Sequence, residues 1–222
     1  MVQLIVVGEG PTEERFITEL LAPTLAPNVF VTPRIIPTSS SSRGGGLNLD
    51  RVKRALRNTL RERSDSYVST FFDLYALGPT FRGVIDTRGQ PPSVRAQAIE
   101  GLLHQDIIAY AQCRPERFLP HIQPHEFEAL LFSDVSRLRE VEPDWAIHED
   151  SLRRVGEAVE NPEWINDAPE TAPSKRLRVL RPKYRKVTHG PLVAAKIGLD
   201  KIREMCPHFQ QWFARIASLR PL

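Results

Sequence analysis

The feature that most constrains this chain is a short apolar run near its start that ends at an acid flanked by glycines. Residues 4–7 are all aliphatic, and the run stops at the turn Gly8-Glu9-Gly10-Pro11. An unbroken apolar run of this length, ended by glycine, is typical of a strand buried on both faces, as in a parallel sheet. Ligands bind at the carboxyl ends of strands in open α/β sheets. Glu9 is therefore the first candidate site residue.

The residues after this turn predict a helix. Thr12 is placed to cap it, and Glu13 and Glu14 fall in its first turn, where carboxylates suit the positive end of the helix dipole. Apolar residues at positions 16, 17, 20 and 21 share one helical face. Two interpretations stay open for this segment alone: its acids bind a ligand, or they only cap the helix.

Strand and helix signals then alternate along the chain. The run 29–36 contains Pro33, which favours an edge strand or a bulge. Further strands are predicted at 67–77, which contains Asp73, and at 118–122, with helices at 49–60 and 94–111. The polar segment 38–46 predicts a mobile loop. This alternation predicts an α/β fold with four parallel strands and crossover helices.

From residue 134 onward the strand signals stop. Short helical segments at 151–160, 191–205 and 207–219 are separated by proline-rich connections. At 222 residues, one α/β domain with a large elaboration is favoured over two independent domains. We predict an α/β core over 1–133 and a helical cap over 134–222.

Composition excludes several classes of protein. No apolar run is long enough for a transmembrane helix, and the N-terminus lacks the basic start of a signal peptide. The two cysteines form neither a zinc pattern nor a disulfide framework, which fits a reducing cytoplasm. Cys206-Pro207-His208 has no matching metal fragment elsewhere. No Walker A loop follows Gly10 and no G-x-S-x-G elbow is present, so this chain is not expected to hydrolyse ATP or to use a serine nucleophile.

Acidic residues lie at the predicted end of three strands. They are Glu9, Glu13, Asp73, Glu126 and Glu128. Because parallel strands place their carboxyl ends at one edge of the sheet, these acids can converge, and clustered carboxylates repel unless a cation neutralises them. An all-oxygen site suits Mg²⁺ or Mn²⁺. His125 is either a further ligand or base, or a histidine held in place by hydrogen bonds.

The turn and the later acid resemble a known type of domain. Glu9-Gly10-x-x-Glu13 after an opening strand, with an acid on the third strand, resembles the Toprim domains of topoisomerases, bacterial primases and OLD-type nucleases. The stretches GEGPTEERF, PHIQPHEFEALLF and CPHFQQWFARIASL resemble a bacterial family of unknown function with a Toprim-like core. This resemblance covers nearly the whole chain. It implies a three-layer Toprim-like core with a mostly parallel four-stranded sheet, plus the C-terminal helical cap.

The resemblance also implies roles for individual residues. Glu9 matches the Toprim glutamate, Glu13 the second acid of the OLD-like turn, and Asp73 the first aspartate of the Asp-x-Asp pair. Tyr75 stands where the second aspartate is expected, so Glu126 or Glu128 is the candidate for the missing ligand. Relatives of this type often occur beside ABC-type or SMC-like ATPases in apparent phage-defence pairs, which implies an ATPase partner.

A basic run in the cap is the second candidate site. Residues 175–186 contain seven basic side chains and no acid. Its cations can hold phosphates while a tyrosine stacks on a base, and a plain solvated surface is the alternative. The predicted nucleic-acid-binding residues are Lys175, Arg176, Arg178, Arg181, Lys183, Tyr184, Arg185 and Lys186.

Two functions follow from these patterns. The first is a Mg²⁺-dependent (or Mn²⁺-dependent) nuclease-like protein, with Glu9 and Glu13 as catalytic acids and with Glu9, Asp73, Glu126 and Glu128 as metal ligands. The second is a non-catalytic binding subunit, whose degenerate Toprim core contacts an ATPase partner or nucleic acid. The absent second aspartate favours the second function, and the retained acids favour the first.

Overall fold

The computed structural model of the protein describes residues 1–36, 46–166 and 169–222, and a parallel sheet lies at its centre. The sheet runs in the order β2-β1-β3-β4, with β5 also paired to β3, and each of these pairings is parallel. The predicted α/β class with a mostly parallel sheet is confirmed. The strands are β1 (Val2–Gly8), β2 (Val29–Ile35), β3 (Ser66–Asp73), β4 (Phe118–Leu119) and β5 (Ile122–Gln123).

β2 and β3 each show a feature that bears on the predicted strands. β2 lies at the edge of the sheet, where Pro33, opposite Val6, is tolerated because an edge strand can lack one donor. β3 ends at Asp73, four residues earlier than predicted, because residues 74–76 form a 3₁₀ turn. This earlier end places Asp73 at the rim of the sheet.

The fourth predicted strand is two short strands. β4 and β5 both pair with β3 but are separated by Pro120 and His121. Proline has no backbone N–H to give to a ladder, so the strand is interrupted there. The backbone oxygen of His121 still accepts from the N–H of Phe72 at 3.3 Å. Within the described residues the sheet thus has five strands, where four were predicted.

The helices follow the predicted alternation. The first begins at Pro11 with Gly10 as its N-cap, so the prediction that Thr12 caps it is wrong; proline is favoured at the first helical position. The segment predicted as a mobile loop over 38–46 lies, apart from Gly46, outside the described residues. In chain order up to Gln123 the helical segments are α1 (Pro11–Phe16), η1 (Ile17–Leu21), α2 (Ala22–Leu25), α3 (Leu49–Glu62), η2 (Leu74–Ala76), α4 (Pro92–Ala111) and η3 (Pro115–Arg117).

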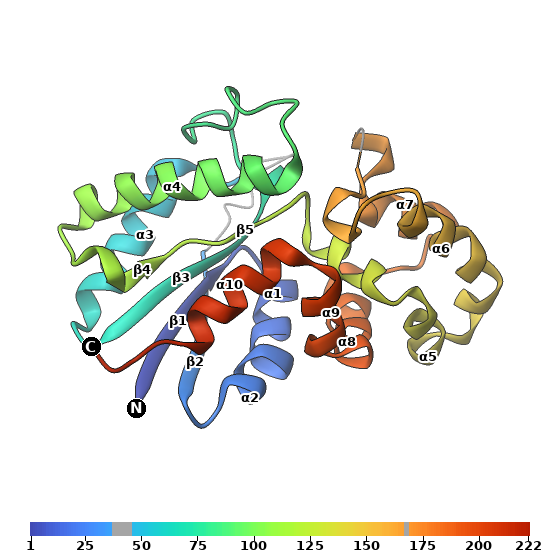
Figure 1. Cartoon of the computed structure of the whole chain (residues 1–222), viewed down its shortest axis with the longest axis horizontal. Coiled ribbons are helices and arrows are strands. Elements are labelled where there is room, and N and C mark those ends of the chain that lie inside the picture. The colour runs from blue at the N-terminus through green and yellow to red at the C-terminus, as the bar shows by residue number, and fades with distance from the viewer. Residues whose placement is uncertain (37–45, 167–168) are drawn as a thin grey trace.

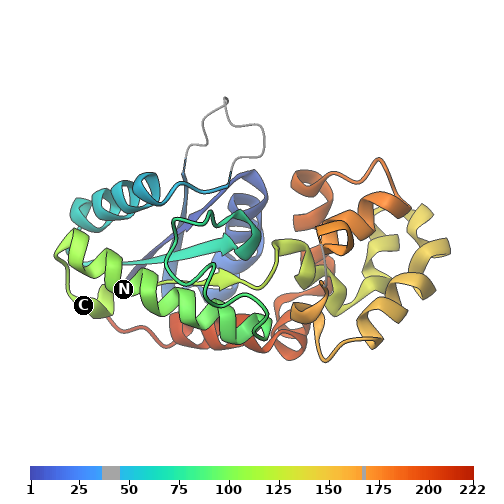
Figure 2. The same ribbon diagram turned by 90° about the horizontal axis from the view of Figure 1, so that it is seen from above.

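The sheet is covered on both faces, so the core has three layers. Leu4 and Val6 of β1 belong to one apolar cluster with α1, η1 and α10, while Ile5 and Val7 belong to another with α3 and α4. This alternation follows from the two-residue period of a strand. Figures 1 and 2 show the strands between these two sets of helices.

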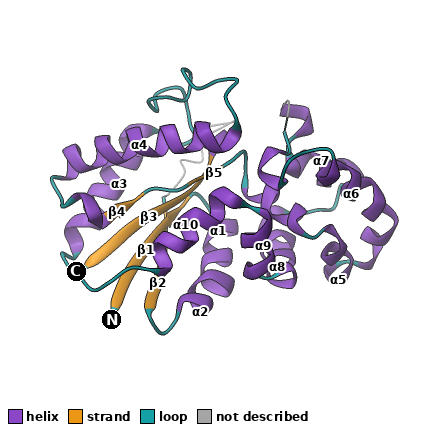
Figure 3. Cartoon of the chain, in the orientation of Figure 1, coloured by secondary structure: helices purple, strands orange, loops and turns teal. Residues whose placement is uncertain are grey.

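After Gln123 the described chain forms helices and loops (Figure 3). A lobe around α5, α6 and α7 lies beside the sheet, and α10 returns to cover one face of it (Figure 1). One apolar cluster joins the lobe to the sheet, and the boundary at 133/134 stays a prediction. The segments are η4 (Phe127–Ser133), η5 (Val135–Arg137), α5 (Leu138–Val141), η6 (Pro143–His148), α6 (Glu149–Glu157), η7 (Pro162–Trp164), η8 (Pro169–Thr171), α7 (Pro173–Leu180), α8 (Lys186–Ile197), α9 (Leu199–Met205) and α10 (Pro207–Ala217).

A helix that crosses a membrane needs about 20 predominantly apolar residues. Within the described parts of the chain, no helix is both long and apolar enough to cross a bilayer.

Candidate acidic site at the sheet rim

The turn after β1 places two acids against each other. Glu9 follows the strand directly, and Glu13 lies in the first turn of α1, where its side chain is buried. Gly8 allows this close approach, because a Cβ at that position would lie 2.9 Å from the Cβ of Glu13. The turn therefore needs glycine for packing of the strand end against the helix.

Asp73 joins these residues from the neighbouring strand. β1 and β3 are parallel neighbours with Gly8 opposite Phe71, so both strands end at the same rim. The backbone N–H of Asp73 donates to Glu9 Oε1, and Asp73 Oδ1 accepts from the backbone N–H of Phe127 at 2.8 Å. The structure thus brings Glu9 and Asp73 together, as expected for the ends of parallel strands.

Glu126 and Glu128 reach the rim from the chain beyond β5. Glu126 accepts hydrogen bonds from the backbone N–H of Ser174 at 2.6 Å and from its hydroxyl at 3.0 Å. Both glutamates are buried, and Lys186 Nζ lies 2.8 Å from Glu126 Oε2 and 2.7 Å from Glu128 Oε2. The backbone of Glu126 is extended and a 3₁₀ segment begins at Phe127. The carboxylates of Glu126 and Glu128 nevertheless both contact the ammonium group of Lys186.

The residue before Glu126 has an uncommon backbone conformation. His125 is buried and has φ of 61°, in the left-handed region that non-glycine residues rarely adopt. Backbone strain of this kind is concentrated at functional sites, where the surrounding structure enforces it. The turn redirects the chain from β5 toward the two glutamates.

Burial changes the protonation of the acids. Burial, and then the charge of Glu13, raises the pKa of Glu9 to about 8. Burial also raises the pKa of Glu13, and burial with the charges of Glu9 and Glu13 raises the pKa of Asp73 well above its ordinary value. Burial raises the pKa of Glu128 to about 7, against the charge of Lys186. Several acids therefore keep protons near neutral pH when no further cation is present.

Lys186 supplies the positive charge seen inside this group. It is the first residue of α8, a helix of the C-terminal half that packs against α1. Burial lowers its pKa, but the charges of Glu128, Asp73 and Glu126 outweigh burial, and the pKa of Lys186 is raised. We call Glu9, Glu13, Asp73, Glu126, Glu128 and Lys186 the acidic cluster.

The basic run does not act as one surface. Lys186 points into the acidic cluster, and Tyr184 is 3% exposed, with its hydroxyl 3.5 Å from Glu128 Oε1. In this structure Tyr184 is covered and Lys186 is paired with acids, and their role in binding nucleic acid stays a prediction. Arg181 pairs with Glu142 and Asp144. Arg176 is half-buried and donates to the backbone oxygen of Thr171, while the exposed members are Lys175, Arg178, Lys183 and Arg185.

Tyr75 does not take part in the acidic cluster. It lies in the 3₁₀ turn after β3, its side chain is 43% exposed, and its ring centroid lies 5.6 Å from that of His125. Its backbone N–H donates to the oxygen of His125 at 3.1 Å. The position at which the resemblance to Toprim domains predicts a second aspartate thus contributes no carboxylate, and Glu126 and Glu128 bring carboxylates from another segment.

A second group of side chains that could hold a metal ion was not predicted. Glu100, His121 and His208 each offer one ligand atom, and these atoms lie within 4.8 Å of one another. They come from α4, from the break between β4 and β5, and from α10. No local spacing links them, so only the fold brings them together.

Comparisons with known proteins place the chain in a family. No curated protein and no solved structure matches it. A family model described as "Domain of unknown function (DUF4276)" matches residues 8–217, a range that contains every predicted site residue. The resemblance to Toprim domains stays a prediction. Since the match covers most of the chain, the protein belongs to this family of unknown function, DUF4276.

Proposed function

We propose that this protein is a Mg²⁺-dependent (or Mn²⁺-dependent) nuclease-like enzyme that cleaves phosphodiesters at the acidic cluster, with chemistry of the Toprim type. The observation that supports it most is the meeting of Glu9 and Asp73 at the ends of neighbouring parallel strands, with Glu126 and Glu128 arriving from a separate segment. Carboxylates gathered in this way favour a hard divalent cation.

The donor set fits such an ion. One oxygen of Glu9 and one of Asp73 are held by backbone N–H groups, which fixes the orientation of both carboxylates. We assign the second oxygen of Asp73 to the metal, with Glu128 as a further ligand and Glu13 as a ligand or a support for Glu9. The second oxygen of Glu9 either binds the metal or carries a proton. When bound, the metal supplies charge stabilisation for the phosphodiester and a more acidic water.

Glu9 is the candidate proton carrier. Without a bound metal ion, burial, and then the charge of Glu13, raises the pKa of Glu9 to about 8, near neutral pH. A general acid or base is most effective when its pKa lies near the working pH. Glu9 would then take a proton from the attacking water or return one to the leaving oxygen.

The test compares cleavage of DNA and tRNA by the wild type, Glu9→Gln and Asp73→Asn, with Mg²⁺, with Mn²⁺ and with EDTA. We expect metal-dependent cleavage that falls by about 100-fold or more in both variants, the usual contribution of a positioned acid or base. Glu14→Gln is the matched control, because Glu14 lies in the same helical turn but is exposed. Equal rates for wild type and Glu9→Gln would refute a catalytic Glu9.

Two observations favour a second candidate function, a non-catalytic subunit that contacts nucleic acid or an ABC- or SMC-like ATPase. Tyr75 replaces the second Toprim aspartate, and the Lys186 ammonium already neutralises part of the acidic cluster. In this case the exposed cations of the basic run would hold phosphates.

The second candidate is tested by salt-dependent nucleic-acid binding of Lys183→Glu/Arg185→Glu. Arg54→Glu/Arg61→Glu is the control, because it changes the net charge equally at exposed positions of α3. Weaker binding and a smaller salt slope in the first variant alone would support it. Unchanged affinity would exclude the basic run, and co-purification with a neighbouring ATPase would test the protein partner.

A further inference from the structure

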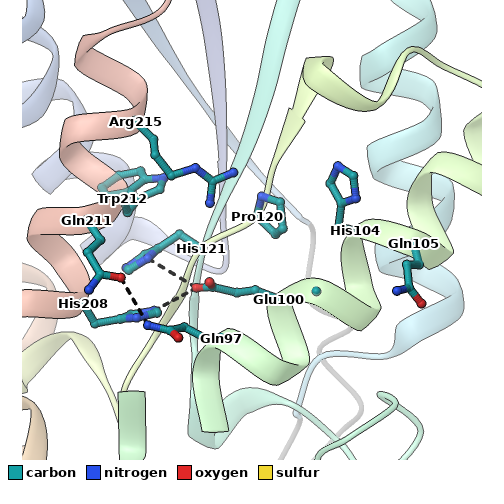
Figure 4. A pocket seen from close by; sticks show the side chains of 11 residues that line it. Gln97, Glu100, His104, Gln105, Pro120, His121, His208, Gln211, Trp212 and Arg215 are labelled. Atoms are coloured by element: carbon teal, nitrogen blue, oxygen red, sulfur yellow. Dashed lines mark hydrogen bonds and ion pairs between the residues drawn. The ribbon is translucent and has the colours of Figure 1, made fainter. Parts of the chain in front are cut away.

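The open edge of the sheet carries a group of side chains that the proposed nuclease chemistry does not use. β4 and β5 form this edge, and α4 and α10 come from opposite faces of the sheet to meet beyond it. Glu100 projects from α4, His208 lies in the first turn of α10, and His121 lies between the two strands. Figure 4 shows the three side chains pointing toward one another.

The ligand atoms of Glu100, His121 and His208 lie close to the distances that separate ligands in a metal site. His208 Nε2 lies 2.9 Å from Glu100 Oε1, and His121 Nδ1 lies 3.6 Å from the same oxygen. One ligand atom from each residue lies within 4.8 Å of the others. Bonds of 2.0–2.1 Å in a tetrahedral zinc site place ligand atoms roughly 3.3 Å apart, between the two shorter distances. Small side-chain movements would close the remaining gap.

The hydrogen bonds around His121 leave the lone pair of its Nδ1 facing Glu100. Gln123 Nε2 points to Glu163 Oε1 at 3.5 Å, so its carbonyl oxygen faces His121 Nε2 at 3.3 Å. A carbonyl oxygen accepts, which puts the ring proton on Nε2 and leaves a lone pair on Nδ1. This Nδ1 is buried and makes no hydrogen bond to the described residues. A lone pair that faces a carboxylate oxygen is repelled, and a cation bound between the two would remove this repulsion. The same oxygen of Glu100 accepts from the backbone N–H of Ile122 at 2.7 Å and lies 2.9 Å from His208 Nε2.

The surroundings also match those of a metal site. His121 and His208 are 0% and 3% exposed, and the Gln123 contact is the type of outer hydrogen bond that orients metal-bound histidines. A pocket of about 550 Å³ adjoins the three residues. Gln97 and Gln211, which are exposed and hydrogen-bonded to each other at 3.2 Å, lie at its rim. The pocket therefore gives an ion a route from solvent.

We propose that Glu100, His121 and His208 bind a Zn²⁺ ion whose fourth position faces this pocket. Two imidazoles and one carboxylate are a ligand set that suits zinc, and three protein ligands leave one position for water or another small ligand. Mg²⁺ prefers oxygen ligands, so this site and the acidic cluster select different ions. The bound zinc would join α4 to α10 across the sheet edge.

The first experiment measures zinc binding to the full chain after EDTA treatment and dialysis. We expect one Zn²⁺ per chain at this site, a higher melting temperature with zinc, and a Co²⁺ derivative with the visible spectrum of a tetrahedral site. X-ray absorption of the zinc-loaded wild type should show two imidazoles bound to the metal. Absence of binding, or a bound zinc without two imidazoles, would overturn the proposal, and neither result depends on a variant that folds.

The second experiment locates the ion with variants. Glu100→Gln keeps the shape of the side chain and is expected to weaken zinc binding at least as much as loss of an outer hydrogen-bond partner does, about 10–100-fold, and so is His208→Asn. His104→Asn is the control, because His104 lines the same pocket but bonds to the backbone oxygen of Pro115 at 3.0 Å. Glu9→Gln tests whether zinc binds at the acidic cluster instead. Unchanged binding in Glu100→Gln, or loss in Glu9→Gln, would overturn the assignment.

Discussion

Replacing Lys186 by methionine removes the ammonium group that lies between Glu126 and Glu128. Methionine keeps the length and much of the apolar stem of the side chain, so the change is mainly one of charge. In the native protein Nζ lies 2.8 Å and 2.7 Å from the two carboxylates, whose side chains are 7% and 0% exposed. The variant leaves both carboxylates buried without this partner.

The size of the effect follows from these distances. At an effective dielectric constant of 20, each pair at this separation attracts by about 6 kcal/mol. Desolvation of each ion offsets several kcal/mol, and removal of one partner from a buried pair usually costs about 3–5 kcal/mol. Lys186 is 29% exposed, which weakens the pair, so we expect the free energy of unfolding to fall by about 3 kcal/mol.

Urea unfolding at neutral pH in EDTA measures this change. Lys183→Met is the matched control, since Lys183 is exposed in the same basic run and its loss should cost less than about 0.5 kcal/mol. Adding Glu128→Gln to Lys186→Met should restore part of the stability, because a neutral amide replaces a buried carboxyl group that has lost its counter-ion. If Lys186→Met is no less stable than Lys183→Met, the reasoning about the acidic cluster is wrong.

Three further predictions concern pH, packing and a buried arginine. The pKa of Glu9 is raised from 4.5 to about 8, so between these values the folded state holds a proton that the unfolded state has lost. The contribution of Glu9 to stability is therefore fully present below about pH 4.5, falls as the pH rises to about 8 and levels off above, and Glu9→Gln should flatten the urea-midpoint curve measured in EDTA over this range. Gly8→Ala should lower the melting temperature because its Cβ would meet Glu13, whereas Gly156→Ala, with open space around it in α6, should not. Arg117→Met should lower the free energy of unfolding by about 3 kcal/mol in urea titrations, because it leaves the buried backbone oxygens of Ser66 and Leu60 without this donor; an effect below about 1 kcal/mol would contradict this role.

The apolar pattern of the strands was enough to predict the class of the fold. The run at residues 4–7 predicts a strand buried on both faces, and the structure places alternate residues of β1 in two apolar clusters. Pro33 predicts an edge, and β2 lies there. These predictions succeed because burial of alternating side chains and the missing proline donor act over a few neighbouring residues.

The sequence pattern predicted the structure less well where competing local preferences or tertiary contacts determine it. The first helix begins at Pro11, so Thr12 lies inside it and does not cap it. Proline is favoured at the first helical position, which competes with a cap at Thr12. The strand predicted over 118–122 divides at Pro120. The basic run 175–186 reads as a single cationic surface, but folding turns Lys186 inward and buries Tyr184. Charge along a sequence does not reveal which side chains a packed helix places inside.

The sequence by itself determined the parallel α/β core, the glycine-flanked turn and the placement of Glu9 at the end of the first strand, because each depends on short-range periodicity and backbone preference. Only the tertiary structure decided that Lys186 enters the acidic cluster and that Glu100, His121 and His208 meet at the sheet edge. These contacts join segments that lie far apart in the chain. They depend on how the layers pack, which no local pattern of residues encodes.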